Sequence, residues 1–137
     1  MREAIAAAIG TSGAFIISSL GGWDTSLQTL VSFMAINYIS GLAVAGIFKR
    51  SKNSVNGALS SDYCWRGLAK KGMKLLFVLI GYRLDLMIGA DFVRTAIIIA
   101  FISHELISII ENAGMMGIPI PAKLYKAIDI LNGKELI

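Results

Sequence analysis

The chain has little charge and a single cysteine, and each of these shortages limits the classes of protein to which it can belong. Only 16% of its 137 residues are charged, whereas a soluble domain has about 25%. Because 55% of the residues are hydrophobic and the mean hydropathy is +0.69, the composition is that of a single-domain membrane protein. The lone Cys64 cannot form an internal disulfide, and no cysteine and histidine cluster indicates a metal site.

The sequence also lacks the patterns of an enzyme. His104 and Glu105 begin like the zinc-hydrolase motif His-Glu-x-x-His, but Ser108 stands where the second histidine ligand belongs. Serine, histidine and acid lie on one strip of one helix, with no nucleophile elbow and no glycine-rich loop before a helix. We therefore expect no catalytic residue, no metal and no cofactor.

Four apolar runs predict an all-α membrane protein. We expect about four spans arranged as two hairpins, at 4–20, 27–48, 73–90 and 94–113, with a loop at 49–72 and a tail at 114–137. The second run has 22 residues, enough at about 1.5 Å per residue to cross a core of about 30 Å. The last two runs are short, so three spans with the first run lying flat is the alternative. A short amphipathic helix over 122–131 is predicted within the tail.

Basic residues are concentrated in the one long polar segment. Seven of the 13 lysines and arginines lie there: Lys49, Arg50, Lys52, Arg66, Lys70, Lys71 and Lys74. Such a cluster suits either phosphate or nucleic-acid binding or a cytoplasmic loop that sets topology. No aromatic interleaving favours nucleic acid, so we expect a cytoplasmic loop, with a helix that starts at Ser61 or Asp62 as N-cap. Both termini and Cys64 are then cytoplasmic.

Small residues recur every four positions on two predicted helices, which favours close helix packing in lipid. The first helix carries them at Ala6, Gly10, Ala14 and Ser18, and the third at Gly81 and Gly89 on either side of Asp85. This pattern predicts that Asp85 is buried against another helix. Arg83 points away from Asp85, toward the outer membrane interface.

The last predicted span carries most of the intramembrane polar groups. Buried carboxylates in a lipid-soluble helix are costly, so they are expected to face protein or water. We interpret these groups, together with Asp85, as pore-lining or assembly residues; substrate or proton binding and structural hydrogen bonding are the alternatives. They are His104, Glu105, Ser108, Glu111 and Asn112.

Two short motifs in this region carry a resemblance to a known family. The run ELISIIENAG (105–114) followed by GIPIP (117–121) resembles the C-terminal signature of the toxin-secretion/phage-lysis holin family. Upstream positions agree with it in order and spacing: Leu59, Ser60, Ser61, Gly67, Leu68, Lys70, Lys71, Leu84, Asp85 and Arg94. The resemblance covers residues 59–131. His104 and Met115 depart from it, since asparagine and a basic residue are expected there.

The resemblance implies a holin, a protein that oligomerises in the bacterial cytoplasmic membrane and forms a non-specific lesion. Its implied partners are copies of itself, membrane lipid, and the endolysin or toxin that passes through; nucleic acid is not among them. The alternative is a small proton-coupled exporter, which calls for a carboxylate in the middle of an early helix, and the first two predicted helices have none. A membrane adaptor that binds a partner through the basic loop is a third reading.

Overall fold

Helices make up all the regular structure of the described residues, 1–50 and 57–131, in the computed structural model. The expected all-helical class is confirmed, and Lys52 and Lys134 lie outside the described residues. In chain order the elements are α1 (Arg2–Ser19), α2 (Thr25–Ala43), the π-helical turn η1 (Val44–Phe48), α3 (Ser61–Ile88), α4 (Val93–Met115) and α5 (Ala122–Leu131).

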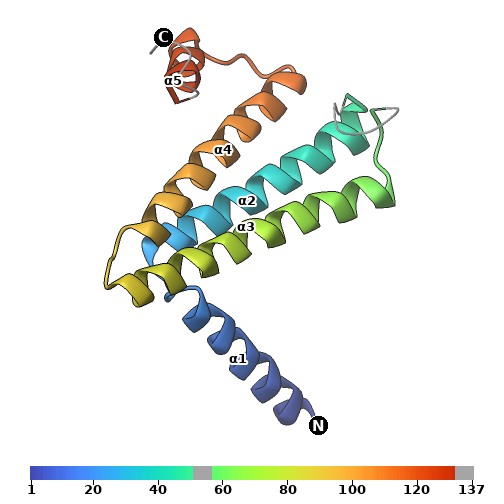
Figure 1. Cartoon of the computed structure of the whole chain (residues 1–137). Helices are drawn as coiled ribbons and strands as arrows, with labels where there is room; N and C mark the ends of the chain where they lie inside the picture. Colours follow the sequence, from blue (N-terminus) through green and yellow to red (C-terminus); the bar gives the residue numbers. More distant parts are fainter. Residues whose placement is uncertain (51–56, 132–137) are drawn as a thin grey trace.

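Helices α2, α3 and α4 run side by side and form a three-helix unit (Figure 1). Helix α4 packs against both of the others, so its apolar run supplies the centre of the unit. The buried residues of α2 recur mainly three and four positions apart. They therefore lie on one face of the helix, and this face enters the core. The buried core consists of Leu20, Leu27, Leu30, Met34, Val78 and Ile98.

Helix α1 projects away from the three-helix unit (Figure 1), and none of its residues is buried. The chain turns at Gly21 and Gly22, whose φ angles of 95° and 101° favour glycine. The prediction of two hairpins is therefore met only by α3 and α4. The expected first hairpin is not formed, because α1 points away from the unit and does not run beside α2 (Figure 1).

Among the described residues, two segments are long and apolar enough to cross a membrane, Thr25–Phe48 with 24 residues and Val93–Met115 with 23. These correspond to the second and fourth predicted spans. Helix α3 begins at Ser61, twelve residues before the predicted span at 73, so much of the basic segment is helical. Its N-cap is Ser60, whose hydroxyl accepts a hydrogen bond from the Tyr63 N–H, and not Ser61 or Asp62 as expected.

Helix α5 has the predicted bounds, Ala122–Leu131. It is separated from α4 by Gly117, with φ of 84°, and by Pro119 and Pro121, which cannot continue a helix. The predicted amphipathic helix is therefore present as a separate element beyond the end of α4 (Figure 1).

Candidate functional site

The buried carboxylate of Glu105, halfway along α4, is the centre of a polar cluster between three helices. Its side chain is 0% exposed. Lys74 Nζ lies 2.6 Å from Glu105 Oε1, and Lys71 Nζ lies 3.1 Å from Oε2. Asn37 of α2 donates its amide N–H to Oε2. We call Asn37, Lys71, Lys74 and Glu105 the mid-helix cluster.

The partners of Glu105 make its burial tolerable. An isolated carboxylate in an apolar medium loses its hydration, so buried charges are paired or neutralised. Here two ammonium groups and one amide share one carboxylate, which leaves the cluster with a formal excess of one positive charge. The two lysine side chains are 18% and 16% exposed, so they reach the carboxylate from the edge of the unit.

Amide groups extend this cluster between α2 and α4. Asn112 Nδ2 lies 3.0 Å from Asn37 Oδ1 and 2.9 Å from Ser40 Oγ, and both contacts are hydrogen bonds that the amide donates. On the other side, the Lys74 ammonium donates to His104 Nδ1 at 3.0 Å. Because Nδ1 accepts, this contact assigns the proton of a neutral imidazole to Nε2.

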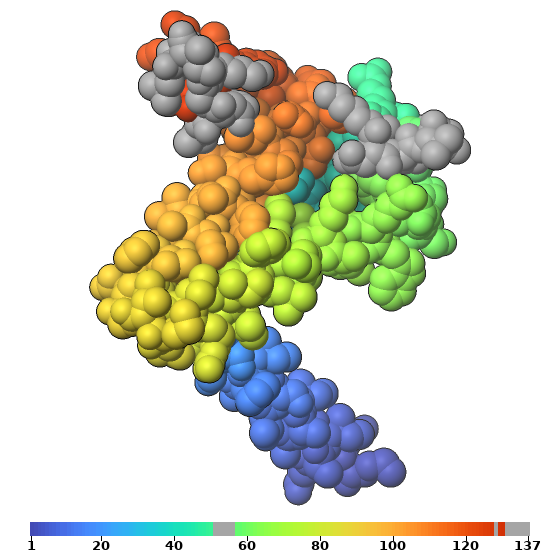
Figure 2. Space-filling model, viewed as in Figure 1, coloured from blue at the N-terminus to red at the C-terminus, as the bar shows by residue number. Residues whose placement is uncertain are grey.

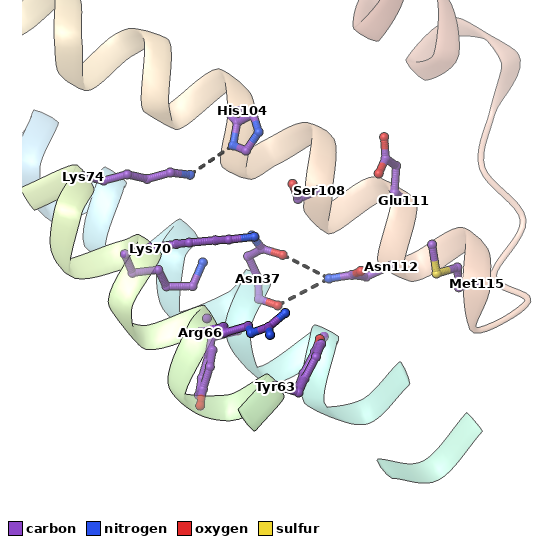
Figure 3. A pocket seen from close by; sticks show the side chains of 14 residues that line it. Asn37, Tyr63, Arg66, Lys70, Lys74, His104, Ser108, Glu111, Asn112 and Met115 are labelled. Carbon is purple, nitrogen blue, oxygen red and sulfur yellow. Dashed lines mark hydrogen bonds between the residues drawn. The ribbon is translucent and has the colours of Figure 1, made fainter. Parts of the chain in front are cut away.

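A cavity of about 520 Å³ opens next to the cluster, between α3 and α4 (Figure 3). Figure 2 shows the corresponding hollow between the green and orange helices, with α2 at its base. One wall is the basic face of α3. The other holds most of the polar residues predicted on the last span. The charged and polar groups in these two walls include Arg66, Lys70, Lys71, Lys74, His104, Ser108, Glu111 and Asn112.

A second polar cluster joins the helix ends at the opposite side of the apolar core. Arg94 Nη1 lies 2.7 Å from Asp24 Oδ2. Its Nη2 donates to the Gly22 carbonyl at 3.1 Å, and its Nε donates to the Leu20 carbonyl. The Asp24 side chain is 49% exposed, and the hydrogen bond from Arg94 holds the pKa of this carboxyl below its ordinary value. We call Asp24, Asp85 and Arg94 the turn cluster.

Asp85 in this cluster caps a helix other than its own. Its carboxylate accepts the backbone N–H groups of Val93 at 2.9 Å and Arg94 at 3.0 Å. These N–H groups lie in the first turn of α4, where no intrahelical acceptor exists. The predicted burial of Asp85 is observed, and its partner is the start of the next helix.

The predicted small-residue positions have different surroundings. A Cβ on Gly81 would lie 2.8 Å from Ile97 Cδ1 and 2.9 Å from Arg94 Cα, so this glycine permits the close approach of α3 and α4. Gly89 ends α3 with φ of 70° and has no atom within 4 Å of an added Cβ. The α1 positions are all exposed: Ala6, Gly10, Ala14 and Ser18.

The remaining predicted residues lie at the edges of the site. Lys49 and Arg50 are exposed beyond η1, and Arg66 pairs with Asp62 on the surface of α3 at 3.0 Å. Over residues 1–50 and 57–131, no group of three or more histidine, cysteine or acidic side chains is placed to hold a metal ion. The sequence interpretation did not foresee that Lys71 and Lys74 meet Glu105, or that Arg94 meets Asp24.

The chain resembles known proteins over most of its length. It is 37% identical to an uncharacterized 14.9 kDa protein from the nagH 3′ region of Clostridium perfringens, over 84% of this chain and 83% of that protein. It is 36% identical to an uncharacterized protein of Listeria monocytogenes, over 90% and 83%. A probable holin of Bacillus phage phi105 is 26% identical over 77% and 73%. No solved structure matches.

The sequence model of the bacteriophage holin family matches residues 14–133. Members of that family are membrane proteins and are generally not enzymes, which agrees with the two apolar segments of this chain. The resemblance noted from the motifs at 105–121 is thus confirmed over a longer stretch of sequence. The chain belongs to the bacteriophage holin family.

Proposed function

We propose that this protein oligomerises in the bacterial cytoplasmic membrane and forms a non-specific lesion that releases an endolysin or a toxin. The observation that carries the proposal is the family match over residues 14–133. The probable holin of Bacillus phage phi105 is the relative whose name points to the same activity.

Assembly of several copies follows from the size of a single copy. The cavity beside the mid-helix cluster has a volume of about 520 Å³, which suits a small molecule and not a folded protein. A lesion that passes an enzyme is therefore built between chains. The exposed small-residue face of α1 supports this step, because small side chains let helices approach closely in lipid.

The mid-helix cluster supports a closed state before the lesion opens. In the single chain, Glu105 is satisfied by groups of the same chain. Lining a lesion instead requires such polar groups to turn toward water shared between copies. In this proposal the pore-lining or assembly residues are Asp85, His104, Glu105, Ser108, Glu111 and Asn112, and separation of the Glu105 ion pairs accompanies opening.

We propose four spans with both termini in the cytoplasm for the assembled state, in which α1, which is exposed and lies outside the three-helix unit in the single chain, folds back to cross the membrane beside α2. The charged residues of α3 would keep this helix from spanning the membrane only if they faced lipid. However, Lys71 and Lys74 pair with Glu105, and Asp85 caps α4, so three of these charges are held inside the three-helix unit. Arg83 is exposed near the end of the helix, where its side chain can extend to the interface.

The basic residues Lys49, Arg50, Arg66 and Lys70 then lie on the cytoplasmic side, as the positive-inside rule requires. Cys64 tests this arrangement, because it is the single thiol of the chain. A membrane-impermeant maleimide is expected to label it only after the inner membrane is opened. Labelling in intact cells contradicts the topology.

Timed expression tests the function. We expect protein to accumulate while the membrane potential stays normal, followed by an abrupt collapse, with lysis within minutes when a cytoplasmic endolysin is co-expressed. Endolysin expressed alone is the control and leaves the cells intact. A graded ion leak that never releases the endolysin contradicts the proposal and favours an exporter.

A further inference from the structure

A stripe of side chains on α3 that begins at the cavity and continues past it is charged at one end and apolar at the other, as a membrane lipid is. Arg66, Lys70, Met73 and Phe77 are spaced i, i+4, i+7 and i+11, so they form one stripe along the helix. The first two are cationic and the last two apolar, and all four are exposed. At about 1.5 Å per residue the stripe is roughly 16 Å long, close to half the thickness of a membrane core.

The cationic end of this stripe has a net positive charge. Four cationic side chains line the cavity, Arg66, Lys70, Lys71 and Lys74. Glu105 neutralises one of them from behind, and Glu111 contributes one carboxylate to the wall. In the described part of the chain Lys70 has no ion pair, and the pair of Arg66 with Asp62 is exposed, at 71% and 72%, so water screens it.

The position of the cationic end of the stripe, at Arg66 and Lys70, also suits a lipid headgroup. It lies where α3 begins and where α2 and α4 end, at the boundary of both apolar segments. Trp65, next to Arg66, is exposed, and tryptophan is enriched at membrane interfaces. Basic pockets between spanning helices on the cytoplasmic side are known to accept anionic lipid headgroups.

We infer that Arg66 and Lys70 bind the phosphate group of an anionic phospholipid whose acyl chain lies along Met73 and Phe77. A free phosphate ion satisfies the charge but leaves Met73, and the side of Phe77 that does not pack against Phe101, exposed. This inference concerns the closed single chain and does not depend on lesion formation.

Native mass spectrometry of the full chain in detergent tests the site, with phosphatidylglycerol and phosphatidylcholine offered in equal amounts. We expect the wild type to retain phosphatidylglycerol preferentially. The variant Arg66→Gln with Lys70→Gln is expected to lose that preference by roughly fivefold for each charge removed. Both residues are exposed, and an unchanged helix content by circular dichroism verifies the fold of the variant.

The matched control is Lys123→Gln with Lys126→Gln, which removes the same charge from α5, outside the cavity. The control is expected to retain the preference. An equal loss in both double variants shows general surface attraction and overturns the site. Met73→Gln is expected to lower lipid retention, and unchanged retention overturns the acyl-chain position. Displacement of the lipid by a large excess of inorganic phosphate overturns the lipid assignment in favour of a free-phosphate site.

Discussion

The turn cluster and the mid-helix cluster both hold charged side chains between helices, but their partners differ in kind. In the turn cluster, Arg94 donates to two backbone carbonyls and Asp85 accepts from two backbone N–H groups. In the mid-helix cluster, Glu105 is bound by the side chains of Asn37, Lys71 and Lys74. The difference follows from position, because helix ends leave backbone groups free whereas the middle of a helix does not.

This contrast separates a fixed part of the molecule from a part that can change partners. The turn cluster lies where the ends of four helices meet, α1, α2, α3 and α4, so it anchors the α1–α2 and α3–α4 turns to each other. The lysines of the mid-helix cluster lie on long, flexible side chains at the edge of the cavity. Glu105 can therefore be released by side-chain movement without unfolding a helix.

Breaking the mid-helix cluster is expected to have the largest effect on stability. Glu105→Leu leaves two lysine ammonium groups without their shared carboxylate, and removal of one partner from a buried pair costs about 3–5 kcal/mol. Unfolding of the purified chain by SDS titration in micelles measures this loss. The control Glu111→Leu removes an exposed carboxylate from the same helix and is expected to change stability by no more than about 0.5 kcal/mol. Equal stabilities for the two variants would contradict the importance of the pair.

Breaking the turn cluster is expected to cost less. Arg94→Leu removes hydrogen bonds to the Leu20 and Gly22 carbonyls and to Asp24, but Asp24 is half exposed and is hydrated in the variant. A hydrogen bond to a charged group contributes about 1.5–3 kcal/mol, so we expect a loss of about 2 kcal/mol in the same titration. Arg83→Leu, at an exposed arginine on α3, is the control. A loss of stability for Arg94→Leu as small as that of the control would contradict the role of the turn cluster as an anchor.

The close approach of α3 to α4 between the clusters is tested by glycine substitutions. Gly81→Ala places a methyl group 2.8 Å from Ile97 and 2.9 Å from the Arg94 backbone, and overpacking costs about 1–3 kcal/mol. Gly72→Ala is the matched control, because no atom lies within 4 Å of its added Cβ. The control is expected to be neutral or to stabilise α3 by up to about 1 kcal/mol. Equal stabilities for both variants would contradict this close approach of α3 to α4.

The smallest expected effect is the pH dependence of Asp24. Its pKa is lowered from 3.8, mainly by the hydrogen bond from Arg94. The pair therefore contributes stability above the ordinary pKa, and this contribution is lost as pH falls through the lowered pKa of the folded chain. Because Asp24 is half exposed, the contribution is at most about 1 kcal/mol. Unfolding titrations from neutral to acidic pH are expected to show a shallower decline for Asp24→Asn than for the wild type; parallel declines would exclude the pair as a cause.

Hydropathy and helix-ending residues predict the helices well but not all of their contacts. Glu105 and Asp85 were expected to face other helices, because carboxylates are excluded from lipid. Lys71 and Lys74 were interpreted as residues that set the membrane topology, because the positive-inside rule considers each loop by itself. The α3–α4 hairpin explains this contact. Lys74 and Glu105 are separated from the turn that follows Gly89 by nearly equal numbers of residues, and antiparallel helices bring such positions together.

Other contacts have no comparable local signal. Asp24 and Arg94 are 70 residues apart, and their pairing depends on how α2 sits against the α3–α4 hairpin. The direction of α1 depends on the φ angles of Gly21 and Gly22, which glycine permits but does not dictate. Asn37 and Asn112 were both visible as polar residues in apolar helices, but their hydrogen bond required the register of α2 against α4.

We propose that the ion pairs of Glu105 hold the closed chain until the lesion opens. The most direct measurement is the lag before collapse of the membrane potential, recorded during timed expression of wild type, Glu105→Gln and Arg83→Gln at matched amounts of protein in the membrane. We expect earlier collapse for Glu105→Gln, because a neutral amide binds the two lysines less strongly, and an unchanged lag for Arg83→Gln. A lag for Glu105→Gln that equals or exceeds that of the wild type at the same accumulated amount would contradict the claim.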